Sequence, residues 1–220
     1  MPVGALIDIH RHGQGDGTVI INIDTSQWTD CEYRAGFYSL GIHPWFIERQ
    51  DCKVALQTLK SALADANLLA IGECGLDKLS GAPFSLQESI FIKQLELAEQ
   101  FRKPVVIHCV RAFNELLRIK AALNPLMPWI VHGFNNKTSI ATSLLEQGCY
   151  LSFGKALLHP NSNASKVLPV VPRDRFFLET DDSYLAIDSI YRAAVTIMQI
   201  DLLELQQCLE NNFNRVFLHD

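Results

Sequence analysis

Histidine and carboxylate residues recur where short apolar runs end, from the first to the last quarter of the chain. We expect β-strands at five of these runs, residues 5–9, 68–72, 105–107, 129–131 and 176–178. The residues at or just past their ends are His10, His12, Glu73, His108, His132 and Asp181. Residues so far apart converge only if the strands are parallel and end on one face, where barrel enzymes carry their chemistry. The pattern therefore predicts an α/β barrel with a two-metal site at that face.

Strands and helices alternate after the first quarter of the chain, as in parallel βα units. We expect helices at about 52–66, 86–101, 113–123 and 138–147, strands at 149–153 and 175–179, and two helices within 187–217. With 220 residues, 48% of them hydrophobic, the chain can bury one sizeable core. We predict a (β/α)8 TIM-type barrel that forms a single domain over residues 1–220.

The first quarter breaks this alternation. Residues 11–17, three of them glycine, separate the first strand from the next expected strand at 18–23, whereas a helical crossover needs about a dozen residues or more. Before the strand at 37–40, the connection 25–36 holds at most a turn or two. The first crossover helices should therefore be trimmed and the barrel wall thin at that point.

Two solutions could cover a thin wall. One is an irregular flap made by aromatic residues of the chain itself, and the other is a second copy or a protein partner docked on the exposed apolar surface. The aromatic residues are Trp28, Tyr33, Phe37, Tyr38, Trp45 and Phe46.

Composition excludes several function classes. The net charge of −5 gives no general attraction to nucleic acid or to anionic lipid, so any phosphate must be bound by local charge. No stretch reaches the roughly 18 apolar residues of a membrane span, and a basic leader is absent. The six cysteines form no CxxC pair, which favours reduced thiols. We expect a cytoplasmic protein with no membrane partner.

The spacing of the histidines favours metal binding. His10 and His12 project to the same side of a strand and can face one ion, although such a pair is more often structural. Glu73 has two oxygens with which to bridge two cations, and His108 and His132 would complete the second ion. Five of the seven histidines fall at strand ends, which supports metal ligation over a structural role. Such donors suit zinc, manganese, cobalt or nickel, and magnesium where substrate phosphate supplies oxygens.

Seven segments together carry a resemblance to a known family: residues 8–12 (Asp-Ile-His-Arg-His), 41–44 (Gly-Ile-His-Pro), 70–77 (Ala-Ile-Gly-Glu-Cys-Gly-Leu-Asp), 104–108, 132–134, 179–181 and 212–217. In this order and spacing they resemble the TatD family of metal-dependent deoxyribonucleases. The resemblance implies a (β/α)8 barrel that cuts DNA phosphodiesters with divalent metal. The implied metal ligands are His10, His12, Glu73, His108, His132 and Asp181. It also implies that His43 contacts phosphate. The chain departs from the family at Val110, where an arginine is usual and Arg111 follows one place late.

These observations predict a two-metal phosphodiester hydrolase acting on single-stranded DNA or on 3′ strand ends. Asp181 would accept the proton of the attacking water, Glu73 would bridge the metals, and His43 and Arg111 would hold a phosphate oxygen. Lys155 is a further candidate for phosphate contact, as are Lys78 and Lys137. The alternatives are an amidohydrolase-type enzyme acting on esters or amides, and a non-catalytic subunit of a nucleic-acid-processing assembly.

Overall fold

The computed structural model describes residues 5–30 and 36–218. The chain divides into two compact units. Unit 1 combines Met1–Ile21 with Val131–Asp220, and unit 2 is the continuous stretch Asn22–Ile130. Unit 1 is therefore built from both ends of the sequence.

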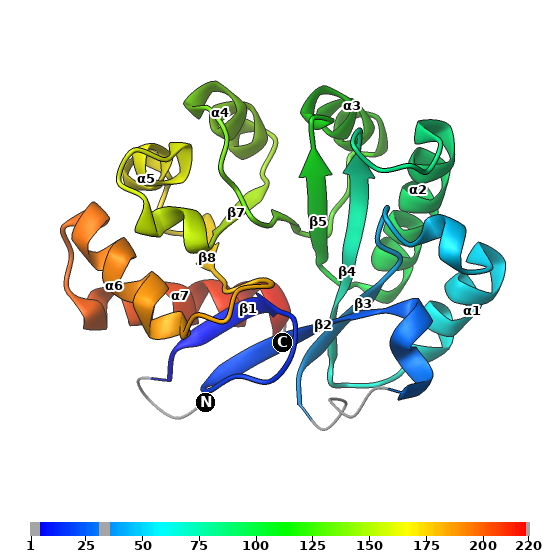
Figure 1. The fold of residues 1–220 in the computed structure, drawn as a ribbon, viewed down its shortest axis with the longest axis horizontal. Coiled ribbons are helices and arrows are strands. Elements are labelled where there is room, and N and C mark those ends of the chain that lie inside the picture. The colour runs from blue at the N-terminus through cyan, green and yellow to red at the C-terminus, as the bar shows by residue number, and fades with distance from the viewer. Residues whose placement is uncertain (1–4, 31–35, 219–220) are drawn as a thin grey trace. The chain divides into compact units, whose positions relative to one another are not determined.

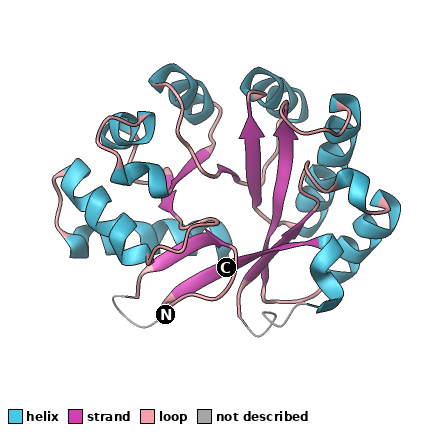
Figure 2. Ribbon diagram, viewed as in Figure 1, coloured by secondary structure: helices cyan, strands magenta, loops and turns pink. Residues whose placement is uncertain are grey.

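Eight strands occur in the described residues, ordered in the sheet as they follow in the chain. They are β1 (Ile7–Arg11), β2 (Thr18–Asp24), β3 (Tyr38–Gly41), β4 (Leu68–Asp77), β5 (Val105–Val110), β6 (Trp129–Val131), β7 (Tyr150–Phe153) and β8 (Phe176–Leu178). The pairs β1–β2, β3–β4, β4–β5 and β7–β8 are parallel. From β4 onward strands and helices alternate (Figure 2). This is the strand order of a (β/α)8 barrel.

Unit 2 packs three helices with β3, β4 and β5: α1 (Cys52–Ala62), α2 (Phe84–Phe101) and α3 (Phe113–Leu123). The long strands β4 and β5 lie side by side (Figure 1). Two buried glutamines, two turns apart on α2, hold the backbone of the neighbouring segments. Gln94 bonds the amide and carbonyl of Ile42, and Gln87 does the same for Asp77. Helix α2 therefore fixes two segments that carry candidate site residues.

In unit 1 the helices of the second half of the chain hold β1 and β8. These helices are α4 (Thr138–Glu146), α5 (Asn163–Val167), α6 (Ile187–Met198) and α7 (Leu202–Phe217). The buried hydroxyl of Tyr191 on α6 accepts from the amide of Ile7 and donates to its carbonyl. Asn212 on α7 donates to the carbonyl of Phe176, the first residue of β8. The C-terminal helices thus position the strand that carries His10.

The predicted trimming of the first crossover helices is confirmed. Residues 12–17, between β1 and β2, contain no helix. In the described part of the next connection there is only a 3₁₀ helix, Thr25–Asp30. Between β1 and β2 the chain forms no α-helix because this connection is too short to return along a strand as a helix.

The aromatic residues expected to cover the thin wall do not behave alike. Trp28 packs against Tyr38 at a ring-centroid distance of 5.6 Å, whereas Trp45 is 55% exposed. Tyr33 lies outside the described residues. The flap and the docked partner therefore both remain predictions.

Three strands extend beyond the predicted boundaries. His10, Glu73 and His108 lie inside β1, β4 and β5 and not at their ends. Strand β4 continues because its polar second half still pairs with β5, with Cys74 opposite Ile107 and Asp77 opposite Val110. His12 and His132, by contrast, directly follow β1 and β6.

None of the described helices is long and apolar enough to cross a membrane. The five described cysteines are all free thiols: Cys52, Cys74, Cys109, Cys149 and Cys208. Their state agrees with the expected reduced cysteines.

Candidate metal centre

Three predicted site residues meet in unit 2, in what we name the Glu73 group: His43, Glu73 and His108. One carboxylate oxygen of Glu73, Oε1, lies 3.1 Å from His43 Nε2 and 2.7 Å from His108 Nδ1. One donor atom from each of the three residues falls within 4.8 Å of the other two, as around a metal ion. All three side chains are largely buried. The structure thus brings Glu73 and His108 together, with His43 beside them.

The backbone of β4 brings this group together. Gly75 permits a close approach to β5, because a Cβ atom there would overlap the carbonyl oxygen of His108. The amide of Glu73 donates to Asn22 Oδ1 over 2.7 Å. Glycine at 75 and asparagine at 22 thus place the carboxylate of Glu73 against the ring of His108.

His43 is held in one tautomer. Its Nδ1 accepts a hydrogen bond from the backbone amide of Trp45 over 3.1 Å, so the ring proton is on Nε2, which faces Glu73. A nitrogen that carries a proton cannot bind a metal. This geometry supports the prediction that His43 contacts substrate and is not a metal ligand.

Asp77 is a member of the site that sequence reasoning did not single out. Its Oδ2 lies 3.0 Å from His108 Nε2 and accepts a hydrogen bond from Trp45 Nε1 over 2.6 Å, while Oδ1 accepts from the amide of Leu79. Burial raises the pKa of Asp77, but the hydrogen bonds from His108, Leu79 and Trp45 outweigh it and lower the pKa below its ordinary value. Spacing could have revealed this residue, because Asp77 and Glu73 are four apart on one strand and share a face.

The other predicted ligands meet in unit 1, in what we name the Asp181 group: His10, His12, His132 and Asp181. His10 Nε2 and His12 Nε2 each lie 3.6 Å from the same oxygen, Asp181 Oδ1. The rings of His10 and His132 are 4.3 Å apart at their centroids. Donor atoms of His10, His132 and Asp181 lie within 4.8 Å of one another. Three imidazoles and one carboxylate therefore lie together in unit 1. His132, which we expected to complete the second ion with His108, lies here with His10 and Asp181.

Main-chain bonds fix this second group. The amide of Asp181 donates to the carbonyl of His10 over 2.9 Å, and the amide of His12 donates to the carbonyl of Asp181 over 3.1 Å. Asp181 has a φ of 55°, in the left-handed region that aspartate and asparagine enter more readily than most residues. The two histidines and the carboxylate are thus positioned by the backbone.

Glu179, two residues before Asp181, is fully buried beside His132. Its Oε1 lies 3.4 Å from His132 Nδ1 and accepts a hydrogen bond from the amide of Gly133 over 2.6 Å. Its Oε2 is buried without a hydrogen-bond partner among the described residues. A buried carboxylate with an unsatisfied oxygen calls for nearby positive charge.

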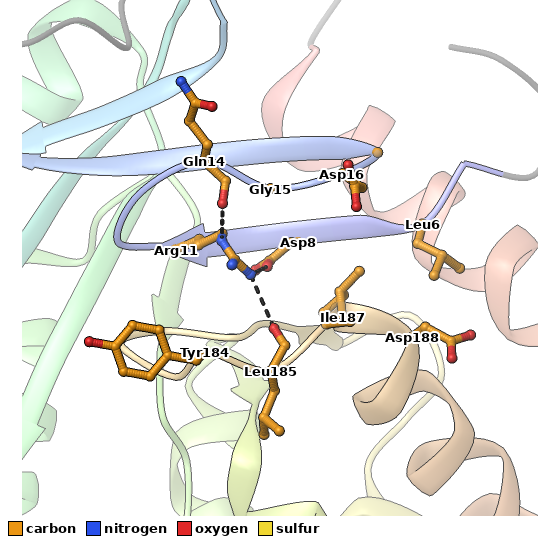
Figure 3. Close-up of a pocket in the computed structure, with 12 residues that line it drawn as sticks. Leu6, Asp8, Arg11, Gln14, Gly15, Asp16, Tyr184, Leu185, Ile187 and Asp188 are labelled. Atoms are coloured by element: carbon orange, nitrogen blue, oxygen red, sulfur yellow. Dashed lines mark hydrogen bonds and ion pairs between the residues drawn. The ribbon is translucent and has the colours of Figure 1, made fainter.

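Arg11 and Asp8, on the same strand as His10, do not join the metal-binding side chains. Asp8 is buried and accepts from the amide and the hydroxyl of Thr180. Burial raises its pKa to about 6, although these bonds oppose the shift. Arg11 bonds Gln14 and Leu185 and lines a cavity of about 550 Å³ beside the short β1–β2 connection (Figure 3). Asp8 and Arg11 are therefore held by Thr180, Gln14 and Leu185 and not by the candidate metal ligands.

The predicted phosphate contacts are at exposed positions. Arg111 directly follows β5 with an exposed side chain and a φ of 55°. Lys155 follows β7 and its Nζ lies 2.5 Å from Asp182 Oδ1. The hydrogen bond that Lys155 donates to Asp182 raises the pKa of Lys155. Lys78 is paired with Glu115, and Lys137 is exposed.

The donor sets of both groups fit divalent metal ions. Imidazole with carboxylate is the ligand combination of zinc and related metals. Two ligands about 2.0–2.1 Å from one tetrahedral ion stand roughly 3.3 Å apart, close to the 3.6 Å between His10 or His12 and Asp181. The unsatisfied oxygen of Glu179 also suits a site that carries positive charge. The residues present therefore fit metal binding.

Residues 14–218 match the family model described as TatD related DNase. The chain belongs to this family. The family resemblance predicted from its motifs is thereby confirmed, and the match spans most of the sequence.

Two curated relatives illustrate the range of the family. The uncharacterized metal-dependent hydrolase YjjV of Escherichia coli K12 is 29% identical over 153 residues, covering 68% of this chain and 59% of the relative. The 3′-5′ ssDNA/RNA exonuclease TatD of Pantoea ananatis is 31% identical over 152 residues, covering 66% of this chain and 57% of the relative. The matched part is thus less than two thirds of either relative.

Solved structures confirm the fold class. The crystal structure of YjjV, a TatD homolog from Escherichia coli K12, superposes with a TM-score of 0.85 at 22% identity, covering 99% of this chain and 100% of that one. An uncharacterized amidohydrolase from Saccharomyces cerevisiae gives a TM-score of 0.70 at 13% identity, with 90% and 89% covered. The predicted α/β barrel with trimmed first crossovers is therefore correct.

Proposed function

We propose that the chain is a two-metal phosphodiester hydrolase that acts on DNA, single-stranded or at 3′ ends. The observation that carries the proposal is the pair of metal-type groups, the Glu73 group and the Asp181 group, in a chain of the TatD-related DNase family. The relative named a 3′-5′ ssDNA/RNA exonuclease supports a nucleic-acid substrate. Divalent ions in such sites activate water and neutralise charge on phosphate oxygens.

The residues take separate roles in this proposal. His10, His12, His132 and Asp181 would hold one ion, and Glu73 and His108 would hold the other. Asp181 Oδ2 would accept the proton of the attacking water, since its Oδ1 is the oxygen that faces both histidines. His43 would donate its Nε2 proton to a phosphate oxygen.

Local positive charge would bind the remaining phosphates. The overall charge of −5 opposes a polyanion, so the ions and a few side chains must supply the attraction. Arg111 is exposed at the end of β5, and Lys155 is exposed with its ammonium held by Asp182. Exposed Trp45 could stack against a base, a contact worth about 1–3 kcal/mol.

A direct assay tests the proposal. The purified protein, freed of metal and then supplied with manganese, magnesium or zinc, is given single-stranded and duplex oligonucleotides labelled at either end. We expect metal-dependent shortening of single strands from the 3′ end. Full activity after exhaustive chelation, or with one bound ion, would exclude the two-metal mechanism.

The main rival is an amidohydrolase-type enzyme, favoured by the fold likeness to the yeast amidohydrolase. A panel of esters, lactones and amides in the same buffers separates the two, because only the rival predicts turnover of these substrates without nuclease activity. A protein that binds oligonucleotides but cleaves nothing would instead indicate a non-catalytic subunit.

A further inference from the structure

The ring of His108 lies between two carboxylates in unit 2. Nδ1 is 2.7 Å from Glu73 Oε1, and Nε2 is 3.0 Å from Asp77 Oδ2. An ionised carboxylate only accepts hydrogen bonds, and a neutral imidazole has a single N–H to give. A neutral ring of His108 can therefore donate a hydrogen bond to only one of the two carboxylates. The other contact needs a second cation, either an added proton or a metal ion.

The surroundings of Asp77 show which nitrogen keeps the proton. Both oxygens of Asp77 already accept N–H donors, Oδ2 from the Trp45 indole and Oδ1 from the Leu79 amide. N–H groups directed at a carboxylate repel a cation placed among them. The side of the ring that faces Asp77 is therefore built for a hydrogen bond, and the side that faces Glu73 is left for the ion.

We propose that Asp77 is a positioning residue, which holds the proton of His108 on Nε2 and so presents Nδ1 to the metal. This inference rests on the proposed function, because it takes the Glu73 group to bind an ion. With the proton on Nε2, Nδ1 and Glu73 Oε1 are two acceptors 2.7 Å apart. A cation bound to both would satisfy them, as in other carboxylate–histidine–metal arrangements, with the two atoms moved to the roughly 3.3 Å that separates two ligands of one tetrahedral ion.

Asp77 is itself held rigidly. Gln87, buried on α2, accepts from the backbone amide of Asp77 over 2.8 Å and donates to its carbonyl over 3.0 Å. The side chain is almost fully buried. A carboxylate fixed at backbone and side chain can fix the ring it contacts, because little freedom remains for either group.

The first test reads the nitrogens of His108 directly. Protein labelled with ¹⁵N-histidine is studied by NMR without metal and with Zn²⁺, and the His108→Gln variant assigns the signals. We expect Nε2 to carry a proton in both states and Nδ1 to shift on adding Zn²⁺. If Zn²⁺ shifts Nε2 instead, the metal site stands and this inference is wrong. If Zn²⁺ shifts no histidine signal, the proposed function fails.

The second test measures Zn²⁺ affinity by calorimetry in variants of the full chain. In Asp77→Asn the amide can donate to Nε2 and move the ring proton to Nδ1, so we expect about 10- to 100-fold weaker binding at one site. Asp51→Asn is the matched control, because it removes the same charge at the exposed cap of α1, where asparagine also caps well. Unchanged affinity in Asp77→Asn, or equal losses in both variants, would overturn the inference.

A third variant separates positioning from folding. Trp45→Phe removes one donor from Asp77 and leaves the contact with His108 in place. We expect Zn²⁺ affinity within a few fold of wild type, together with the wild-type Nε2 proton. If Asp77→Asn does not fold, the nitrogen measurement on the wild-type protein still decides the inference.

Discussion

The two metal-type groups are held in different ways. In the Glu73 group the side chains contact one another, with nitrogen–oxygen distances of 2.7–3.1 Å. In the Asp181 group the corresponding distances to Asp181 are 3.6 Å, and backbone hydrogen bonds between β1 and residue 181 set the arrangement. The first group is a coupled network and the second is a set of side chains on a fixed scaffold. Substitutions should therefore propagate in the first group and stay local in the second.

The largest effect should follow Glu73→Ala. The change removes the acceptor shared by His43 and His108 and leaves two buried rings without it, at a cost of about 1–3 kcal/mol each. We expect turnover to fall by orders of magnitude and binding of one metal to be lost, measured by oligonucleotide cleavage and by metal analysis. In the adjacent control Cys74→Ala the lost thiol faces the carbonyl of Val106, so activity should persist. Similar behaviour of the two variants would contradict the strand register.

Asp181→Asn should lower turnover by about 10²- to 10⁴-fold, the usual contribution of a positioned base. Asparagine adopts the left-handed backbone of residue 181 as readily as aspartate does, so the melting temperature of the metal-free protein should barely change. Asp182→Asn is the control, since Asp182 is exposed and bonds Lys155. Loss of activity in Asp182→Asn with full activity in Asp181→Asn would reverse the assignment, and a large loss of stability in Asp181→Asn would contradict the fixed scaffold.

Metal removal should affect stability as well as activity. An ion that binds only the folded chain at 100 times its Kd adds about 2.7 kcal/mol to the free energy of unfolding. Chemical denaturation with Zn²⁺ and with a chelator should show this difference in the wild type. The Asp181→Asn variant should retain the part of this metal-dependent stabilisation that comes from an ion in the Glu73 group. Equal stability in both buffers for the wild type would mean that neither group binds the ion.

The smallest effect should come from Lys155→Ala. The pair that Lys155 forms with Asp182 is exposed, so its loss should change the free energy of unfolding by less than about 1 kcal/mol. If Lys155 contacts phosphate, KM for an oligonucleotide should rise a few fold and depend less on salt, with kcat unchanged. Steady-state kinetics at two salt concentrations provide the measurement. An unchanged KM would remove Lys155 from the substrate contacts.

The sequence predicted most of the fold because local signals agreed with the tertiary structure. β6 and α3 have the predicted boundaries. The shortness and glycine content of the segment between β1 and β2 correctly excluded a helix there. Strand β4 was predicted too short because its second half carries Glu73 and Asp77, and carboxylates normally mark the end of a buried strand. In β4 the buried strand continues past these carboxylates because they belong to the candidate site.

Several site features were beyond a sequence reading. Gln87 and Gln94 are polar side chains of a type that is usually exposed, yet both are buried and hold the backbone of other segments. The spacing of Asp77 from Glu73 indicates a shared strand face, but the contacts of Asp77 with Trp45 and His108 are created only by the fold. The proton on His43 Nε2 likewise depends on one backbone amide.

The division of the chain has a consequence for the order of biosynthesis. Unit 2 is continuous from Asn22 to Ile130, so all residues of the Glu73 group are available before the second half of the chain is made. The Asp181 group joins β1 to a residue some 170 positions later, a contact of very long sequence separation. His10 and His12 therefore leave the ribosome early, but their contacts with Asp181 can form only when synthesis is nearly complete. A ribosome stalled before residue 181 should carry a chain that protects His108 from chemical modification but leaves His10 reactive, although His10 is fully buried in the complete structure.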